Sequence, residues 1–371
     1  MMKISPLFII SSSVLFVALF SATPTSAHFF PNITSIPKSL IPNTTAWDRF
    51  NKLAGCEFGQ KLDGLSKLKQ YFQRFGYINQ SFLNFTDDFD DSLESAIKIY
   101  QQNFNLNATG QLDGPTLQHI TRPRCGNPDI VNGTSSMNSG KAAGNTTSPN
   151  IHTVAHYSFF PGRPRWPRGK TELTYAFLPA NQVEDVVRTV FANAFGRWSE
   201  VTPLNFTETS SYNAADIKIG IYSGDHNDGE PFDGVLGTLA HAFSPPSGLL
   251  HLDGDENWVI DGDFLNAPSL ASAVDLESVV VHEIGHLLGL GHSSVEESIM
   301  YPSIASVTRK VELTPDDIQG IQVLYGSNPN SDGPQPTLTP SNEKDSGGSH
   351  GLTASWVLLT AGLLLLLPMI L

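Results

Sequence analysis

The sequence predicts an α+β protein in which a small helical unit precedes a larger domain of strands and helices. Residues 62–120 carry apolar side chains at spacings of three and four, whereas residues 171–325 mix alternating and helical patterns. With 40% hydrophobic and 16% charged residues, the 371-residue chain is too apolar to be disordered and long enough for two or three units. Its 22 basic and 36 acidic residues give a net charge of -14, which disfavours nucleic acid as a partner.

The helical unit is predicted to contain three helices. Residues 62–75 and 92–104 each place apolar side chains on one face, and a short third helix starts at a proline and covers residues 115–120. The residues that follow, 131–150, are small and polar. Because they cannot bury enough apolar surface to order themselves, we expect a linker that is open to proteolysis.

The larger domain alternates strands with helices. Residues 171–178 and 216–222 alternate as strands do, and residues 183–198 have helical spacing between them. A last helix is predicted over residues 315–325, with Thr314 as its cap, proline at its first position and acidic residues in its first turn.

The N-terminal residues have the pattern of a secretory signal. One basic residue, Lys3, precedes an apolar run over residues 6–20 and small residues that end at Ala27. A membrane anchor is the alternative, but the run is short for a span of about 20 residues. We therefore expect residues 1–27 to be removed.

The C-terminal residues have the pattern of a lipid attachment signal. Residues 352–371 are almost wholly apolar, no Lys or Arg follows them, and small residues and a short polar spacer precede them. We expect residues 347–371 to be replaced by a glycosylphosphatidylinositol (GPI) anchor at Ser346, after a stalk over residues 328–346. The expected location is the outer face of the plasma membrane, with a single spanning helix or release to the extracellular space as alternatives.

Asn-x-Ser/Thr triplets become glycan acceptors on a secreted chain, and they then mark exposed backbone. The sequence has eight of them, at Asn32, Asn43, Asn79, Asn84, Asn107, Asn132, Asn145 and Asn205. Seven of the eight precede residue 150, and the compartment they indicate together with the signal is the secretory pathway and the cell surface.

The most specific chemical signal is an eleven-residue histidine pattern. Residues four apart on a helix lie one turn apart on the same face, so His282 and His286 can share one ion. Gly289 lets the chain leave the helix and brings His292 round as a third ligand. Such a zinc site keeps its fourth position open and lowers the pKa of bound water to about 7, and Glu283 is placed to act as the general base. A chance H-E-x-x-H match is the alternative for the first five letters alone.

Residues 55–326 resemble a matrix metalloproteinase of the plant type, with a signal, a pro-segment and a catalytic domain but no hemopexin domain. The resemblance rests on the histidine pattern, on Ser293 after it, and on Met300, which resembles the methionine turn of metzincin proteases. It implies a metzincin domain with a twisted mixed sheet and three helices over residues 151–327, preceded by a pro-segment over residues 28–150. The implied function is a latent zinc endopeptidase that cleaves extracellular or cell-surface proteins.

The sequence around Cys125 resembles the cysteine switch of this family. The resemblance implies that Cys125 binds the zinc in the latent form and that Arg124 and Asp129 pair to hold the loop. A tethered thiolate displaces the water that the reaction needs. Asn127 departs from the apolar residue usual in the family. A disulfide between Cys125 and Cys56 is the alternative, and Cys56 has no other interpretation.

Residues 224–256 resemble the structural ion loops of the family. The resemblance implies a closed structural zinc site and a calcium site, and an acidic surface loop is the alternative. The implied zinc ligands are His226, Asp228, His241 and His251, and the implied calcium ligands are Asp233, Gly234, Leu236, Thr238, Asp253 and Glu256. The loop after Phe243 is shorter than in the family, so the sequence does not decide whether Asp216 is a ligand of a second calcium site.

The resemblance also implies partners. An extended polypeptide substrate would lie along an edge strand over residues 239–243, with an apolar side chain in a pocket beside the histidine helix. Protein inhibitors are a further class of partner. Asp316 would pair with the N-terminal ammonium formed near Tyr157, or it is only a first-turn helix acid. A surface module that docks on a wall polymer, with a purely structural zinc, is the alternative function.

Overall fold

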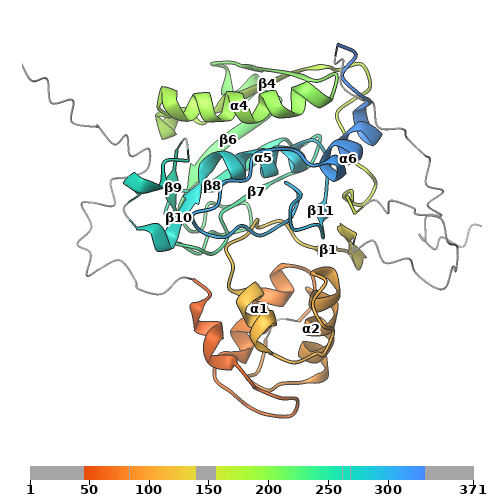
Figure 1. The fold of residues 1–371 in the computed structure, drawn as a ribbon, viewed down its shortest axis with the longest axis vertical. Helices are drawn as coiled ribbons and strands as arrows, with labels where there is room; N and C mark the ends of the chain where they lie inside the picture. Colours follow the sequence, from red (N-terminus) through yellow and green to blue (C-terminus); the bar gives the residue numbers. More distant parts are fainter. Residues whose placement is uncertain (1–45, 83, 139–155, 261, 268, 331–371) are drawn as a thin grey trace, which may run out of the picture. The chain divides into compact units, whose positions relative to one another are not determined.

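The computed structural model describes residues 46–82, 84–138, 156–260, 262–267 and 269–330 (Figure 1). The predicted secretory signal, stalk and lipid attachment residue Ser346 lie outside these residues, as do the predicted glycan acceptors Asn32, Asn43 and Asn145. Among the described residues, no helix combines the length and the hydropathy that a membrane span requires.

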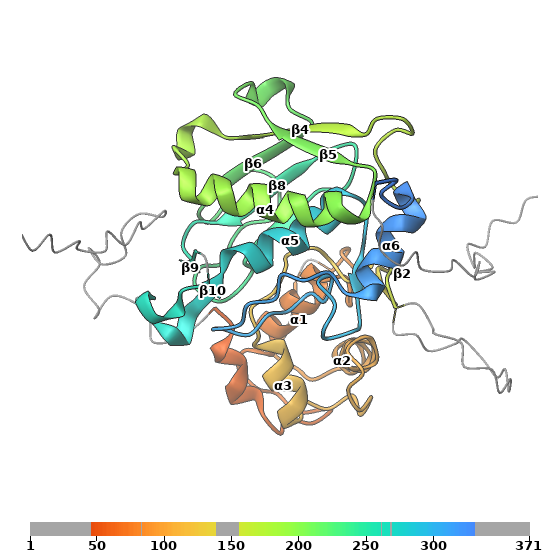
Figure 2. The same cartoon turned by 45° about the horizontal axis from the view of Figure 1, so that its top comes forward.

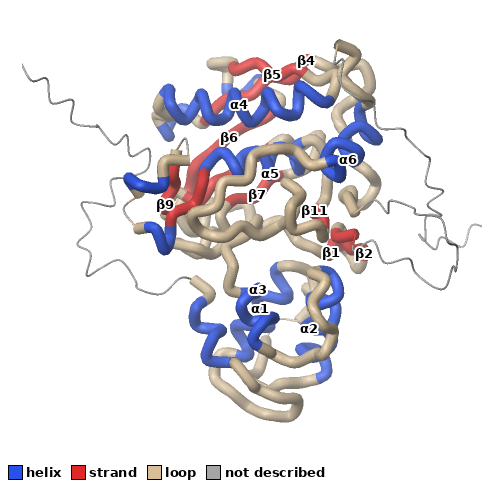
Figure 3. Tube along the Cα trace, in the orientation of Figure 1, coloured by secondary structure: helices blue, strands red, loops and turns tan. Residues whose placement is uncertain are grey.

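The three helices of the N-terminal unit form close to the predicted bounds. They are α1 (Leu65–Arg74), α2 (Asp91–Asn103) and α3 (Gly114–Ile120), preceded by the 3-10 helix η2 (Asp48–Leu53). Asp90 caps α2 by accepting a hydrogen bond from the Leu93 amide, and Asp113 caps α3 in the same way. Their apolar faces bury an aromatic core that includes Phe72 and Tyr100. Figure 3 shows this unit built of helices and loops.

The linker prediction was wrong for residues 131–138. They form part of three two-residue strands, β1 (Ile130–Val131), β2 (Thr134–Ser135) and β3 (Met137–Asn138). β1 pairs with β2, and β3 pairs in parallel with β11 (His292–Ser293). β3 is ordered by pairing with a distant strand, which no local pattern signals. The β1–β2 hairpin turns at Asn132 and Gly133, both with positive φ, and this Asn-Gly pair is a local hairpin signal that the sequence analysis missed.

A five-stranded sheet organises the larger domain (Figures 1 and 2). Its strand order is β5-β4-β6-β8-β7, and β7 at one edge is the antiparallel member. The strands are β4 (Glu172–Phe177), β5 (Asn205–Glu208), β6 (Ile217–Tyr222), β7 (Ala240–Ala242) and β8 (Leu249–Asp253). A separate parallel pair joins β9 (Asn257–Val259) to β10 (Ala273–Asp275).

Three α-helices complete the described part of this domain: α4 (Asp185–Val201), α5 (Leu276–Leu287) and α6 (Pro315–Tyr325). Short 3-10 helices lie at Pro179–Asn181, Tyr212–Ala214, Phe264–Asn266 and Leu270–Ser272. α4 and α5 cross one face of the sheet (Figure 2), and the Trp198 indole of α4 donates to the Val281 carbonyl of α5 at 3.0 Å. The predicted α+β class and the predicted capping of α6 by Thr314 are confirmed.

Candidate metal centre and its cleft

Helix α5 and the turn after it bring the three histidines of the pattern together. α5 is buried along its whole length, so His282 and His286 point into the protein interior from the same face. Gly289 follows with a φ of +104°, and a Cβ there would lie 2.1 Å from the Pro164 carbonyl oxygen. Only glycine fits this exit from the helix, which carries the chain to His292 on β11.

The three imidazoles converge on one point. Their ring centroids are 4.7, 4.8 and 5.5 Å apart. The Nδ1 atoms bond to the Ile299 carbonyl for His282 at 2.7 Å, the Leu290 carbonyl for His286 at 2.8 Å, and the Asp129 carboxylate for His292 at 2.8 Å. Each Nδ1 therefore carries the proton, and each Nε2 keeps a lone pair for a metal.

The donor set fits Zn²⁺. Burial lowers the pKa of His282 and His286, which keeps the imidazoles neutral, and the Nε2 atoms of His282 and His292 are buried with no hydrogen-bond partner among the described residues. Buried nitrogen lone pairs without partners are costly unless a cation takes them. Three neutral histidines facing one point are a zinc donor set.

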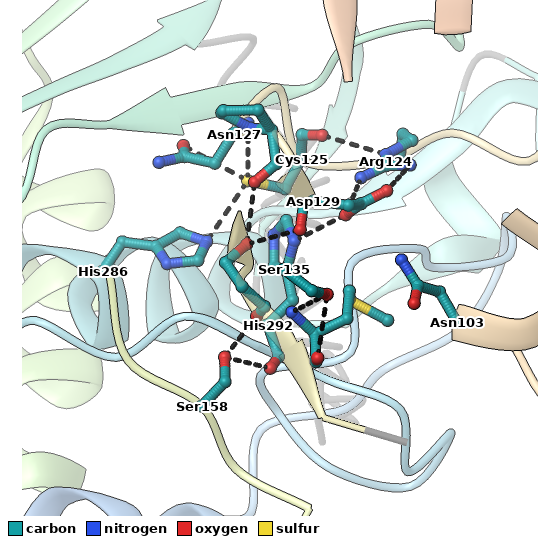
Figure 4. Close-up of polar contacts among 12 residues, drawn as sticks. Asn103, Arg124, Cys125, Asn127, Asp129, Ser135, Ser158, His286 and His292 are labelled. Atoms are coloured by element: carbon teal, nitrogen blue, oxygen red, sulfur yellow. Dashed lines mark hydrogen bonds and ion pairs between the residues drawn. The ribbon is translucent and has the colours of Figure 1, made fainter. Parts of the chain in front are cut away.

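Cys125 lies next to the point on which the three imidazoles converge. Its Sγ is 3.4 Å from Nε2 of His286, and the four possible ligand atoms lie within 4.8 Å of one another (Figure 4). Burial raises the pKa of the thiol, and the neighbouring Glu283 carboxyl adds to this rise. The alternative disulfide is wrong, because Cys125 and Cys56 are both free and Cys56 lies buried in the core of the helical unit.

Glu283 is buried beside the histidines. Burial raises the pKa of its carboxyl to about 8, and the neighbouring Cys125 thiol, which lowers that pKa, offsets only part of the rise. A carboxylate with a raised pKa next to a metal site has the basicity of a group that takes and returns a proton near neutral pH.

The loop that carries Cys125 is held by a buried ion pair (Figure 4). Arg124 donates to both carboxylate oxygens of Asp129, at 2.9 and 2.7 Å, and lies 3.8 Å from the centroid of the Phe75 ring. Burial alone would raise the pKa of Asp129, but Arg124 and His292 outweigh it and hold that pKa below its ordinary value. The two residues are paired, as the resemblance implied.

The same loop lies along edge strand β7. The Leu239 amide donates to the Arg124 carbonyl at 2.9 Å, and the Gly126 amide donates to the Ala240 carbonyl at 2.8 Å. Asn127 adds two hydrogen bonds with the Ala242 backbone, at 2.7 and 2.9 Å. This explains the departure at residue 127, because an amide side chain satisfies backbone groups of the edge strand that an apolar side chain would leave unpaired.

A cavity of about 30 Å³ opens beside α5. Leu239, Val279 and Ile304 give it apolar walls, while Ser303 and Lys310 contribute polar groups. Cys125 is one of the residues that line it.

A second cluster unites four residues from the loop after β6 and from β7 and β8. His226, His241 and His251 each place a ring nitrogen 2.8 Å from Oδ2 of Asp228. The four possible ligand atoms lie within 4.8 Å of one another. Four nitrogen and oxygen donors around one point suit a closed zinc site.

The predicted calcium ligands do not form a comparably tight group. Within the described ranges, the two clusters above are the groups of three or more close metal-ligating side chains. Burial and neighbouring acids raise the pKa of Asp253 to about 7, and its Oδ2 is buried with no hydrogen-bond partner among the described residues. Glu256, whose pKa is also raised, accepts the Leu236 amide at 2.9 and 3.1 Å. Crowded acids of this kind fit a cation.

The remaining acids have partners within the protein. Asp216 is bonded to Lys170 and Thr174. The backbone amides of His156 and Tyr157 donate to Oδ1 of Asp316 at 2.8 and 2.9 Å, so the start of the larger domain reaches this acid in the uncleaved chain.

The described glycan acceptors lie at the surface. All five side chains are exposed, as glycosylation requires: Asn79, Asn84, Asn107, Asn132 and Asn205.

Two contacts of buried acids that support the site were not predicted from the sequence. The contact of Asp129 with His292 joins residues 163 apart, and no spacing rule could find it. Asp317 holds the turn at Met300, and its place beside Asp316 in the first turn of α6 signalled only a helix cap.

Comparisons with known proteins agree with this geometry. Residues 165–326 match the Matrixin family model, and residues 62–120 match a peptidoglycan binding domain model. The chain is 58% identical to Metalloendoproteinase 2-MMP of Arabidopsis thaliana over 92% of this chain and 91% of that protein. It is 56% identical to Metalloendoproteinase 5-MMP of the same plant, over 91% of each chain.

Similarity extends to animal enzymes over a shorter range. The chain is 39% identical to interstitial collagenase of Sus scrofa, over 66% of this chain and 45% of that protein. From the histidine geometry, the family match and the near full-length identity to plant metalloendoproteinases, we conclude that the chain belongs to the matrixin family of zinc-dependent metalloendopeptidases.

Proposed function

We propose that His282, His286 and His292 hold the catalytic zinc and that Glu283 is the general base. The observation that carries this proposal is the convergence of three buried imidazoles whose Nδ1 atoms are all bonded. When bound, Zn²⁺ supplies Lewis-acid chemistry and acidifies water. Glu283 accepts the proton of the attacking water and returns it to the leaving amine of the peptide.

The substrate is an extended polypeptide that pairs with β7. That edge strand bonds the pro-segment through its backbone, which supports its use as a template for any extended chain. A substrate side chain would enter the apolar cavity beside α5 once the pro-segment has left it. Once the pro-segment has left, the same edge and cavity would receive protein inhibitors.

The chain is made as a latent zymogen. Cys125 and the backbone of its loop occupy the metal point and the edge strand together, so a substrate cannot reach either. We assign residues 28–150 to the pro-segment and 151–327 to the catalytic domain, with activation by cleavage between them. After cleavage, Asp316 would receive the new N-terminal ammonium.

The second cluster is a structural zinc site, and the acids near Asp253 hold calcium. Convergence of three histidines on Asp228 supports the first assignment, and the unpartnered buried oxygen of Asp253 supports the second. Both ions would fix the loop between β6 and β7, and through it the edge strand that binds substrate.

Location follows from the sequence at the two ends. A secretory signal over residues 1–27 and an attachment signal over residues 347–371 favour an enzyme held on the outer face of the plasma membrane by a lipid at Ser346, after the stalk over residues 328–346. Phosphatidylinositol-specific phospholipase C should then release the protein from membranes, whereas a spanning helix would keep it there.

Glu283→Gln in the proteolytically activated protein tests the assigned base. The variant should keep its zinc, because the three histidines are unchanged, and lose cleavage of a quenched peptide by at least 100-fold. Glu172→Gln, at the exposed start of β4, is the matched control and should keep full activity. An active Glu283→Gln protein free of contaminating protease would remove Glu283 from the mechanism.

A further inference from the structure

The three histidines differ in where their support comes from. His282 and His286 donate to the carbonyls of Ile299 and Leu290, which belong to the catalytic domain itself. His292 donates to Asp129, which belongs to the pro-segment. Cleavage between the two parts would therefore leave two histidines with their partners and deprive the third of its partner.

The carboxylate that supports His292 is rigidly held. Its Oδ1 accepts hydrogen bonds from His292 and Arg124. Its Oδ2 accepts hydrogen bonds from Arg124 and from the hydroxyl of Tyr77, the latter at 2.8 Å. The side chains of Asp129 and His292 are both fully buried. Water cannot compete for this contact, so it is stronger than an exposed one of the same length.

A second contact with the pro-segment fixes the backbone of the same ligand. β3 pairs in parallel with β11, and Met137 lies opposite His292 in the register. Ser158, at the start of the larger domain, bonds both the Ser136 carbonyl and the His292 carbonyl (Figure 4). Asp129, which contacts the side chain of His292, and β3, which pairs with its strand, both precede the cleavage region. Ser158, which bonds the His292 carbonyl, follows it.

Carboxylates bonded to metal-ligating histidines fix the ring and raise its basicity, and their loss typically costs 10- to 100-fold in metal affinity. We propose that Asp129 is a positioning residue for the catalytic zinc, so that the pro-segment retains the metal through His292 as well as through Cys125. The inference rests on the proposed zinc site. The zinc affinity of the latent chain then exceeds that of the cleaved enzyme, and the difference is larger than the contribution of the Cys125 thiolate alone.

The test compares zinc release from uncleaved protein. All variants carry Glu283→Gln so that the chain does not cleave itself, and Cys125→Ser removes the thiolate. Zinc release to a chromogenic chelator should be 10- to 100-fold faster after Asp129→Asn is added to this background. A His286→Ala protein reports release from the second cluster alone, and this rate is subtracted.

Arg122→Ala is the matched control. Arg122 pairs with Glu296 across the same boundary at 2.8 Å, on the surface and away from the histidines, so its loss should leave zinc release unchanged. Equal release rates with and without Asp129→Asn would overturn the inference. A protein that holds no zinc at the three histidines in any form would instead overturn the proposed function.

A spectroscopic measurement covers the case in which Asp129→Asn does not fold. In the zinc-loaded Glu283→Gln zymogen labelled with ¹⁵N-histidine, the Nδ1 proton of His292 should resonate downfield of those of His282 and His286, because it alone donates to a carboxylate. After proteolytic removal of the pro-segment, this resonance should move upfield while the other two stay. A His292 resonance that does not move on cleavage would overturn the inference without any substitution at Asp129.

Discussion

At the scale of single residues, one buried acid holds the backbone turn that contacts the first histidine. Asp317 accepts hydrogen bonds from the amides of Ile299 and Met300, at 2.9 and 3.1 Å, and from Thr314 at the cap of α6. It is fully buried. The Ile299 carbonyl in turn accepts a hydrogen bond from Nδ1 of His282, so Asp317 connects α6 to the first histidine.

We predict that Asp317→Asn destabilises the catalytic domain by about 3 kcal/mol, because an amide cannot accept all these bonds and places a donor among donors. Urea unfolding of the protein measures this. Asp185→Asn, at the exposed start of α4, makes the same chemical change and should cost less than about 0.5 kcal/mol. Equal losses from the two variants would contradict the prediction.

At the scale of elements, the end of α5 decides where the third histidine lies. Gly289 combines a positive φ with backbone of Pro164 at the position of a Cβ. We predict that Gly289→Ala costs more than about 2 kcal/mol and lowers zinc content, since the turn must shift and carry His292 with it.

Gly196 provides the matched comparison. It lies inside α4 with open space where a Cβ would be, so Gly196→Ala should stabilise the protein by about 0.5–1 kcal/mol and leave its zinc content unchanged. Unfolding curves and metal analysis of the two variants check both statements. Normal zinc content in Gly289→Ala would show that the turn does not set the position of His292.

At the scale of the whole molecule, the helical unit meets the catalytic domain through a buried histidine. His119 in α3 bonds the hydroxyls of Tyr100 and Tyr301, each at 2.6 Å. Burial lowers its pKa to about 3, and the positive charges of Arg122 and Arg124 lower it further than Asp129 raises it. The imidazole is therefore neutral in the folded chain.

This arrangement predicts acid sensitivity. The folded pKa lies below the unfolded value of about 6.5, so the unfolded chain binds more protons between about pH 3 and 6.5, and stability falls as pH falls through this window. At pH 5 the loss from His119 is about 2 kcal/mol. Urea unfolding of wild type and His119→Gln at pH 7 and 5 should show a smaller pH dependence in the variant, and equal pH dependence would contradict the prediction.

Latency also belongs to the whole molecule. Cys125→Ser should give the uncleaved protein measurable activity on a quenched peptide, because a serine hydroxyl is a poor zinc ligand. Activity should stay below that of the cleaved enzyme, since the loop still bonds β7. Cys56→Ser, the same change in the helical core, should stay inactive. A Cys125→Ser protein that is uncleaved on a gel and has no activity on the peptide would mean that the thiol is dispensable for latency.

The sequence by itself determined whatever depends on local spacing. Helix periodicity gave α1, α2 and α4, and the cap residues gave the start of α6. The interval of four between His282 and His286, together with Gly289, predicted three imidazoles that face one point, because helix geometry fixes the first two and a glycine turn is needed for the third.

Tertiary structure alone decided how these pieces support one another. Residues 137–138 pair with β11, Asn127 bonds the backbone of Ala242 in β7, and Asp129 contacts His292 across 163 residues. None of these contacts leaves a local pattern, since each depends on which distant backbone or ring happens to lie within hydrogen-bond range after folding. The convergence of the three imidazoles could therefore be predicted from the chain, but the contacts that Asp129 and β3 make with His292 could not.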